Sequence, residues 1–421
     1  MHRSLYAAAC LLAFSSVANA EWSAFRGPNH DGITDEKVVW PQGSQPKQLW
    51  KVKIGEGFGT VAVGNGHVYL TAGADGQEAL LCLDAKTGNH LWHQVMGKTI
   101  QDKQGGNGPR TTPAVDGQIV YAYGTYFNLI ACDVATGKIV WSHDVAKEFG
   151  DQNSTGGIKA WGNAGSPVVD GDYVFVYGGT GGKTFIAFDK KTGKVAWATG
   201  NEKVTHSSPT VATIHGVRQI VFFTQAGLVS LDTATGKELW RYSFPFSVST
   251  ASTPVIAGDI AYATAGYKVG AGAARITKTG DSWTATEIWR NKDPEELVNH
   301  WTSCVYKDGH LYGIFGFKQH GKAPLKCIEL ATGNVKWSQP GFGPGGTIMA
   351  GEDLVVQGDA GQIAIVKAMP QGYKEIAGGK FFDQGKCWNA AVVSGGQLYA
   401  RSAKKGADDQ PYLISLDVSG K

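Results

Sequence analysis

One short motif recurs along this chain: an acidic residue is followed, eight positions later, by a tryptophan. Four copies read Asp-x-x-Thr-Gly-x-x-x-Trp, one has glutamate for aspartate, and one lacks the Thr-Gly pair. A motif that returns every 43 to 56 residues is an internal repeat, and a repeat constrains the fold before any local propensity does. The pairs are Asp84 and Trp92, Asp133 and Trp141, Asp189 and Trp197, Asp232 and Trp240, Asp281 and Trp289, and Glu329 and Trp337.

The motif has the chemistry of a β-hairpin turn. Aspartate can accept a hydrogen bond from the backbone two residues on, and threonine does so more weakly. Glycine adopts the left-handed conformation that such a turn requires. The tryptophan falls on the second strand, where its ring buries a large area only if another unit packs against it. Stacked repeats of this kind predict a β-propeller.

Two ladders give the number of blades. Ile376 extends the tryptophan ladder by one aliphatic slot, so the first ladder has eight members. A Ser/Thr-Pro segment or a weaker copy, such as Thr112-Pro113, precedes each hairpin and also occurs eight times. We expect an eight-bladed, all-β propeller, with seven blades as the alternative count. The tryptophans expected to dock blade against blade are Trp50, Trp92, Trp141, Trp197, Trp240, Trp289 and Trp337.

The two ends of the chain predict how the ring closes. The last unit, from Tyr412 to Gly420, stops at its hairpin and has no outer strand. A surplus strand at Gln48–Val52 fits that empty edge, and pairing there removes an exposed strand edge. We expect residues 47–421 to form the propeller and residues 21–46 to pack on the ring as an extension. No amphipathic helical pattern is found beyond the first 20 residues.

Residues 1–20 have the layout of a secretory signal peptide, with Arg3, an apolar run and an Ala18-Asn19-Ala20 cleavage site. The apolar run is too short to span a bilayer. We therefore expect an exported chain, periplasmic or secreted, cut after Ala20 and without a transmembrane segment. Removal of Arg3 lowers the formal charge from +3 to +2, which does not favour nucleic-acid partners. Five cysteines then remain, in no metal-binding spacing, so no metal is expected.

The repeat resembles the tryptophan-docking repeat of the quinoprotein, or PQQ-like, propeller superfamily, where PQQ is pyrroloquinoline quinone. The resemblance covers residues 47–421 and is carried by the four complete copies of the motif. It implies one of two branches: PQQ-dependent alcohol dehydrogenases, or the BamB-type component of the outer-membrane assembly machinery, which binds no cofactor. The compact chain is more similar to the BamB type.

Departures from both branches leave the function open. The dehydrogenases carry an adjacent Cys-Cys pair over the cofactor, and no two cysteines are neighbours here. They also carry long insertions between blades. BamB is a lipoprotein, whereas Cys10 lies inside the leader's apolar run and is a poor lipidation site. Fold alone does not decide function.

One position per unit, two residues before the Ser/Thr slot, is expected to ring one mouth of the central channel. The residues there and beside them are not uniform, and two tryptophans, an arginine and two histidines could stack and pair a planar anion. The competing interpretation is that a channel mouth is irregular in every propeller, and that the histidines are structural. The candidate ligand-binding residues are Arg110, Trp161, Asn163, His206, His300, Trp301, Lys386, Trp388 and Asn389.

These residues leave three functions open. The first is an exported binding or scaffold protein of the cell envelope, which contacts other envelope proteins through loops at the channel mouth and between blades and needs no cofactor. The second is a PQQ-dependent oxidoreductase acting on alcohols or sugars, with PQQ and Ca²⁺ at the mouth. The third is a module that binds a carbohydrate or another small ligand in the channel. We expect binding rather than catalysis, and catalytic residues are not assigned.

Overall fold

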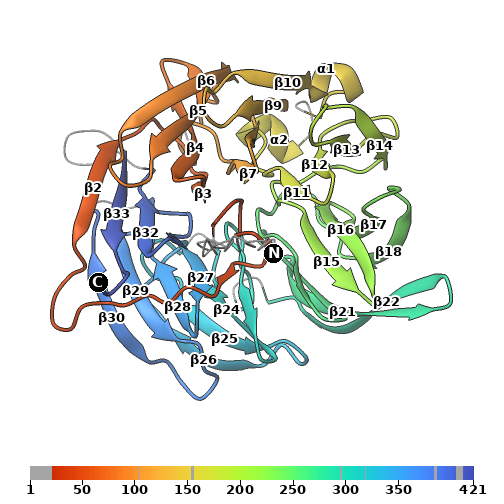
Figure 1. Ribbon diagram of the computed structural model, residues 1–421. Coiled ribbons are helices and arrows are strands. Elements are labelled where there is room, and N and C mark those ends of the chain that lie inside the picture. Colours follow the sequence, from red (N-terminus) through yellow and green to blue (C-terminus); the bar gives the residue numbers. More distant parts are fainter. Residues whose placement is uncertain are drawn as a thin grey trace, which may run out of the picture.

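The computed structural model describes residues 21–102, 104–152, 156–293, 296–317, 319–383, 386–403 and 411–421. The predicted leader, residues 1–20, lies outside the described residues. Within them, eight β-sheets, antiparallel except for the parallel pair of β1 (Ile33–Thr34) with β27 (Gly346–Ala350), radiate from a common centre as the blades of a propeller (Figure 1). Eight blades are therefore confirmed, and the seven-blade alternative is wrong. No helix in this part of the chain is long and apolar enough to cross a membrane.

The first four blades each contain four consecutive strands, the innermost first. They are β3 (Ala62–Gly64), β4 (His67–Ala74), β5 (Gln77–Asp84) and β6 (His90–Lys98); β7 (Ala114–Asp116), β8 (Ile119–Tyr123), β9 (Asn128–Asp133) and β10 (Ile139–Asp144); β11 (Val168–Asp170), β12 (Tyr173–Tyr177), β13 (Phe185–Asp189) and β14 (Val195–Thr199); and β15 (Thr210–Ile214), β16 (Val217–Thr224), β17 (Gly227–Asp232) and β18 (Glu238–Ser243).

The last four blades repeat this plan, except that strands from the N-terminal region join the seventh and eighth. They are β19 (Val255–Ala257), β20 (Ile260–Ala265), β21 (Gly270–Thr279) and β22 (Ser282–Asn291); β23 (Val305–Lys307), β24 (His310–Ile314), β25 (Leu325–Glu329) and β26 (Val335–Gln339); β27 (Gly346–Ala350), β28 (Asp353–Gln357), β29 (Gln362–Lys367) and β30 (Glu375–Lys380) with β1 (Ile33–Thr34); and β31 (Val392–Ser394), β32 (Gln397–Arg401) and β33 (Tyr412–Asp417) with β2 (Gln48–Lys53).

The repeated motif forms the turn between the third and fourth strands of a blade. In the first copy, the Asp84 carboxylate accepts hydrogen bonds from the backbone N–H groups of Lys86 and Thr87, at 3.1 and 2.8 Å, and from the Thr87 hydroxyl. The same arrangement recurs around Asp133, where the Thr136 N–H and hydroxyl bond to the carboxylate. The same geometry repeats from blade to blade because it is local: one short side chain accepts the hydrogen bonds of the N–H and hydroxyl groups within its own turn.

Six of the seven docking tryptophans join their blade to the next. The indole N–H of Trp141 donates to the Lys190 carbonyl at 3.1 Å, in the turn of the next blade, and Gly193 of that turn lies on the indole face. A Cβ on Gly193, whose φ is +71°, would stand 2.7 Å from the ring. Trp50, Trp92, Trp197, Trp289 and Trp337 donate to Ala85, Val134, Thr233, Leu330 and Met369 in the same way.

Two positions depart from this ladder. The Trp240 indole donates to the Gln219 side chain of its own blade, since blade 5 replaces the usual turn with the long β21–β22 hairpin that projects from the ring (Figure 1). In blade 7 the expected slot at Ile376 is wrong: Ala377 pairs with Ile365 at the tryptophan register, and Ile376 is exposed. The same bulge is present in the other blades, but the turn of blade 7 is longer: the Lys367 N–H bonds to the Lys374 carbonyl, whereas the Glu329 N–H of blade 6 bonds to the Asn334 carbonyl.

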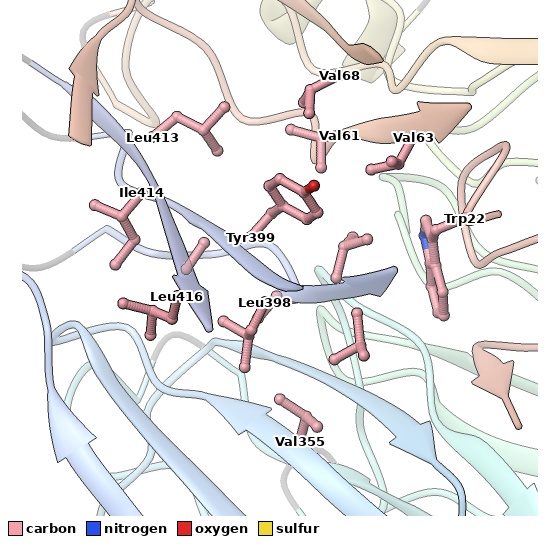
Figure 2. Close-up of a cluster of buried hydrophobic side chains, with 14 of the residues drawn as sticks. Trp22, Val61, Val63, Val68, Val355, Leu398, Tyr399, Leu413, Ile414 and Leu416 are labelled. Atoms are coloured by element: carbon pink, nitrogen blue, oxygen red, sulfur yellow. The ribbon is translucent and has the colours of Figure 1, made fainter. Parts of the chain in front are cut away.

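The N-terminal strand closes the ring as predicted. Strand β2 pairs antiparallel with β33, and Trp50 lies opposite Ser415 (Figure 1). Blade 8 then packs on blade 1 through a buried cluster that includes Val61, Val68, Leu413 and Ile414, with Trp22 at its edge (Figure 2). Trp50 of β2 and the four central residues of β33 are buried where the two ends of the chain meet.

Residues 21–46, here called the N-terminal segment, cross the end of the channel where the innermost strands finish. Hydrogen bonds join this segment to seven of the eight blades. Their partners in the blades are Val63, Val115, Val169, Thr210, Cys304, Met349 and Ser394. Trp22 and Arg26 of the segment are buried. The segment thus acts as a floor for the channel and as a common tie for the blades.

Two short helices, α1 (Val145–Phe149) and α2 (Gly156–Trp161), lie between blades 2 and 3. Both are too short to show a helical period in the sequence. The Asp144 side chain caps α1 by accepting from the Lys147 N–H. Helix α2 ends at Trp161 and carries this candidate residue to the channel mouth.

Replacement of Gly193 by alanine tests the docking geometry. An alanine in the left-handed backbone conformation lowers the free energy of unfolding by about 1 kcal/mol. The steric contact of its Cβ with Trp141 lowers it by roughly a further 1–3 kcal/mol. Gly216→Ala is the matched control, because Gly216 has φ +76° but no atom within 4 Å of its added Cβ. Thermal and denaturant midpoints should fall clearly further for Gly193→Ala. Equal shifts in the two variants would show that the glycine does not serve docking.

Candidate functional site

The central channel contains a cavity of about 510 Å³ that opens where the innermost strands begin. The N-terminal segment closes its other end with Trp22, Phe25 and Arg26. Of the nine candidate ligand-binding residues, seven line this cavity, and Asn163 and Lys386 do not. The seven are Arg110, Trp161, His206, His300, Trp301, Trp388 and Asn389.

A belt of hydroxyl groups sets the positions of the mouth residues. The residue in the Ser/Thr slot of one blade offers its backbone N–H to the slot hydroxyl of the next. The Thr60 N–H donates to Thr112 Oγ1 at 3.1 Å, and the Thr112 N–H donates to Ser166 Oγ at 2.9 Å. The Ser166 N–H continues to Ser208 Oγ at 2.9 Å. Because the mouth residues stand two positions earlier, the belt holds them at a common depth.

Stacked rings span the mouth, and we call Phe58, Trp388, Trp301, Phe317 and His320 the mouth stack. The Trp301 and Trp388 centroids lie 5.2 Å apart with an interplanar angle of 18°. Phe58 stacks on Trp388 at 5.4 Å, Phe317 on Trp301 at 6.1 Å, and His320 on Trp388 at 5.4 Å. The two tryptophans come from blades 6 and 8 and meet in front of blade 7.

The charged groups at the mouth are already paired with the protein. Arg110 forms an ion pair with Asp102 at 2.8 Å, and its guanidinium lies 5.4 Å from the Phe58 ring. Burial lowers the pKa of Arg110, and the Asp102 carboxylate opposes that shift. The Lys386 ammonium donates to the Gly105 carbonyl at 2.7 Å and lies 5.4 Å from the Trp388 ring. Lys386 thus ties two loops together beside the cavity.

The two candidate histidines have polar but uncharged neighbours. His206 Nδ1 is hydrogen-bonded to Ser249 Oγ, and its ring lies 5.8 Å from Trp161. His300 Nδ1 accepts from the Gly266 N–H at 3.3 Å, and its ring meets Trp301 at 5.2 Å. Each ring is therefore held by a polar atom and by an aromatic neighbour of the described loops.

The two candidate asparagines bond to the backbone. Asn163 is fully buried, donates to the Gly124 and Gly165 carbonyls, and accepts from the Gly165 N–H at 2.9 Å. It therefore fixes the turn before β11. Asn389 donates weakly to the Phe58 carbonyl at 3.4 Å and accepts from the Gln357 side chain at 3.2 Å. Asn389 holds blade 8 against blade 1 while one side of it faces the cavity.

Sequence reasoning missed the floor of the cavity and part of its rim. Arg26 donates to the His30, Asp31 and Cys304 carbonyls, and burial lowers its pKa to about 10. The aromatic, turn-rich run from Trp22 to Gly32 was the available signal. The rim residues come from loops that do not follow the repeat, so the spacing of the repeat could not predict them. They are Asp102, Gln104, Ser249, Tyr267 and His320.

The donor set at the mouth does not fit calcium. Ca²⁺ takes six to eight oxygen ligands, several of them carboxylates. In the part of the chain that the structure describes, no three His, Cys, Asp or Glu side chains are grouped to hold a metal. Asp102 is paired with Arg110, and Asp359 accepts from the Gly321 N–H at 3.1 Å. The close contact between Trp301 and Trp388 also leaves no slot for a third planar ring between them.

The cysteines do not contribute to the mouth. All five described cysteines are free and buried. Burial raises the pKa of Cys304 and of Cys387 to about 12, so neither is a thiolate at neutral pH.

The family model described as outer membrane protein assembly factor BamB matches residues 34–181 and 81–339. These matches cover more than half of the sequence, and the chain belongs to this family of PQQ-like propellers. The chain is 26% identical over 353 residues to the outer membrane protein assembly factor BamB of Shewanella oneidensis, which covers 76% of this chain and 77% of that protein.

Quinoprotein enzymes are also similar. The quinohemoprotein alcohol dehydrogenase of Comamonas testosteroni is 26% identical over 306 residues, which are 68% of this chain but 39% of the enzyme. Among solved structures, BamB from Moraxella catarrhalis superposes with a TM-score of 0.58 at 15% identity and covers 89% of this chain and 98% of that chain. At this identity the structural likeness shows the propeller fold alone.

A buried carboxylate behind the mouth makes stability depend on pH. Glu78, in β5, accepts from the Thr125 N–H and hydroxyl at 2.7 and 2.5 Å, and burial raises its pKa to about 7. A carboxyl group whose folded pKa lies above its unfolded pKa stabilises the fold fully at low pH and less as pH rises through the folded value.

Stability should therefore fall by roughly 1–3 kcal/mol between about pH 4.5 and pH 7 from this group. Glu78→Gln should flatten that part of the profile, because the amide keeps the shape and removes the titration. Glu352→Gln, at an exposed carboxylate, is the control and should keep the slope. Denaturant midpoints across this pH range are the measurement, and an unchanged slope in Glu78→Gln would contradict the assignment.

Proposed function

We propose that this chain is an exported, periplasmic binding or scaffold protein of the cell envelope, and that its channel mouth and inter-blade loops contact other envelope proteins. Membership of the BamB family supports this, since relatives in it are named as outer membrane protein assembly factors. We also propose that residues 1–20 are a signal peptide cleaved after Ala20, which would place the propeller outside the cytoplasm.

The observation that carries the proposal is the half-buried aromatic rim on a rigid ring. Trp161 stands at the mouth at the end of α2, and Tyr267, Trp301 and Trp388 stand there on loops between strands. Tryptophan, tyrosine and arginine are the side chains that most often dominate binding energy at protein interfaces. Loops on a stable scaffold are the usual place for such contacts.

A second candidate is a PQQ-dependent oxidoreductase, favoured by the similarity to quinoprotein dehydrogenases and by the convergence of Arg110, His206, Trp301 and Trp388 on one cavity. Bound PQQ would supply two-electron redox chemistry, with Arg110 as the group able to pair a carboxylate. The mouth stack and the paired carboxylates weigh against this candidate, because binding would require both arrangements to change.

Crosslinked capture from envelope extracts tests the proposal. Partners crosslinked by residues 21–421 should be lost when Trp301 or Trp388 becomes alanine, because each removes a large ring from the rim. Trp283→Ala is the matched control, since Trp283 is a half-buried tryptophan on the β22 hairpin outside the cavity. Its capture pattern should match that of the parent chain.

The contrary outcome is equally specific. Saturable quenching of tryptophan fluorescence by PQQ with Ca²⁺, together with a raised melting point and loss of both effects in Trp301→Ala, would replace the scaffold proposal with the oxidoreductase.

A further inference from the structure

The cavity beneath the rim has the dimensions of a small-molecule site. Its volume of about 510 Å³ falls within the roughly 300–1,000 Å³ of such sites. The N-terminal segment seals its floor with buried Trp22 and Arg26, and the rim leaves the opposite end accessible. Partner proteins bound at the rim would not fill this volume. The cavity is therefore available to a separate, smaller ligand.

The charged groups of the described lining are already bonded within the protein. Among the described residues, the charged side chains of the lining are Arg26, Asp102 and Arg110, beside the imidazoles of His206, His300 and His320. Asp102 and Arg110 form an ion pair with 2.8 Å between a carboxylate oxygen and a guanidinium nitrogen. The N–H groups of Arg26 donate to three backbone carbonyls. An anion would have to break the ion pair or reach a buried guanidinium, and a cation would meet two guanidiniums. Burying an unpaired charge is costly, so the lining selects against both.

The uncharged lining combines aromatic faces with hydroxyl groups. The half-buried rings of Trp161 and Tyr267 form part of the cavity wall. Ser208, Ser249 and Thr347 add hydroxyl groups to the lining. Thr347 Oγ1 is buried without a hydrogen-bond partner, as is the indole N–H of Trp388. A buried polar group without a partner costs about 1–3 kcal/mol, which a ligand hydroxyl can recover since it both donates and accepts.

From this combination we infer that the channel cavity is a binding site for a neutral, polyhydroxylated ligand of the oligosaccharide class. Flat, apolar sugar faces pack on the aromatic walls, and the ring hydroxyls bond to the serine and threonine belt.

Calorimetric titration of residues 21–421 tests the inference, with cellobiose, maltotriose and chitobiose as neutral probes. At least one should bind saturably and raise the melting point. Digalacturonate and the chitosan dimer, which are anionic and cationic, should bind at least about tenfold more weakly than that probe. Saturable binding by none of the neutral probes, or tighter binding of a charged one, overturns the inference.

Variants locate the site. Trp161→Ala removes an aromatic wall, and Ser249→Ala removes one hydroxyl with little change in volume. Each should weaken binding about tenfold or more. The melting point without ligand should fall modestly for Ser249→Ala, because His206 Nδ1 loses its hydrogen bond to this hydroxyl. Trp283→Ala is the matched control and should bind as the parent does. Binding that survives both cavity variants would place the saccharide elsewhere. Partner capture at the rim is a separate readout, so its loss or retention does not decide this test.

Discussion

Contact between an indole of one blade and the glycine turn of the next is the interaction on which this propeller depends. The tryptophan fixes the neighbouring turn twice, through an N–H bond to the carbonyl after the acidic residue and through the face on which glycine rests. Neither half is dispensable, since a Cβ on the glycine would occupy the place of the ring. Trp50 carries the same contact from the last blade to the first, so the ladder becomes a closed ring.

Closure of the ring sets the geometry of the channel mouth. The Ser/Thr belt and the N-terminal segment tie the innermost strands at the two ends of the channel, and mouth residues far apart in sequence then meet. Trp301 and Trp388 are brought into contact although they belong to blades 6 and 8. The rim and the cavity beneath it are therefore products of the ring as a whole, and no single blade contains a site.

Much of this architecture could be predicted because its chemistry is local and repeated. The repeated turn acids, glycines and tryptophans predicted eight blades. The surplus strand that begins at Gln48 predicted how the ring closes. The misplaced slot at Ile376 arose because the turn of blade 7 is longer than the turns of the other blades and brings Ala377 into register. The partner of Trp240 depends on a hairpin that breaks the repeat. Tyr267 and Ser249 come from loops of irregular length, which carry no periodic signal, and the floor made by Trp22 required knowing where the N-terminal segment crosses the ring.

Hydrogen exchange across the seam between the first and last blades measures the central claim directly, in the parent chain and in Trp50→Ala. Loss of this indole removes the contact with the Ala85 carbonyl and with Gly88. The backbone amides of β2 and β33 should then exchange much faster while those of β15 to β18 keep their protection. Unchanged exchange in β2 and β33 would show that strand pairing alone seals the ring and that indole docking is not what holds it closed.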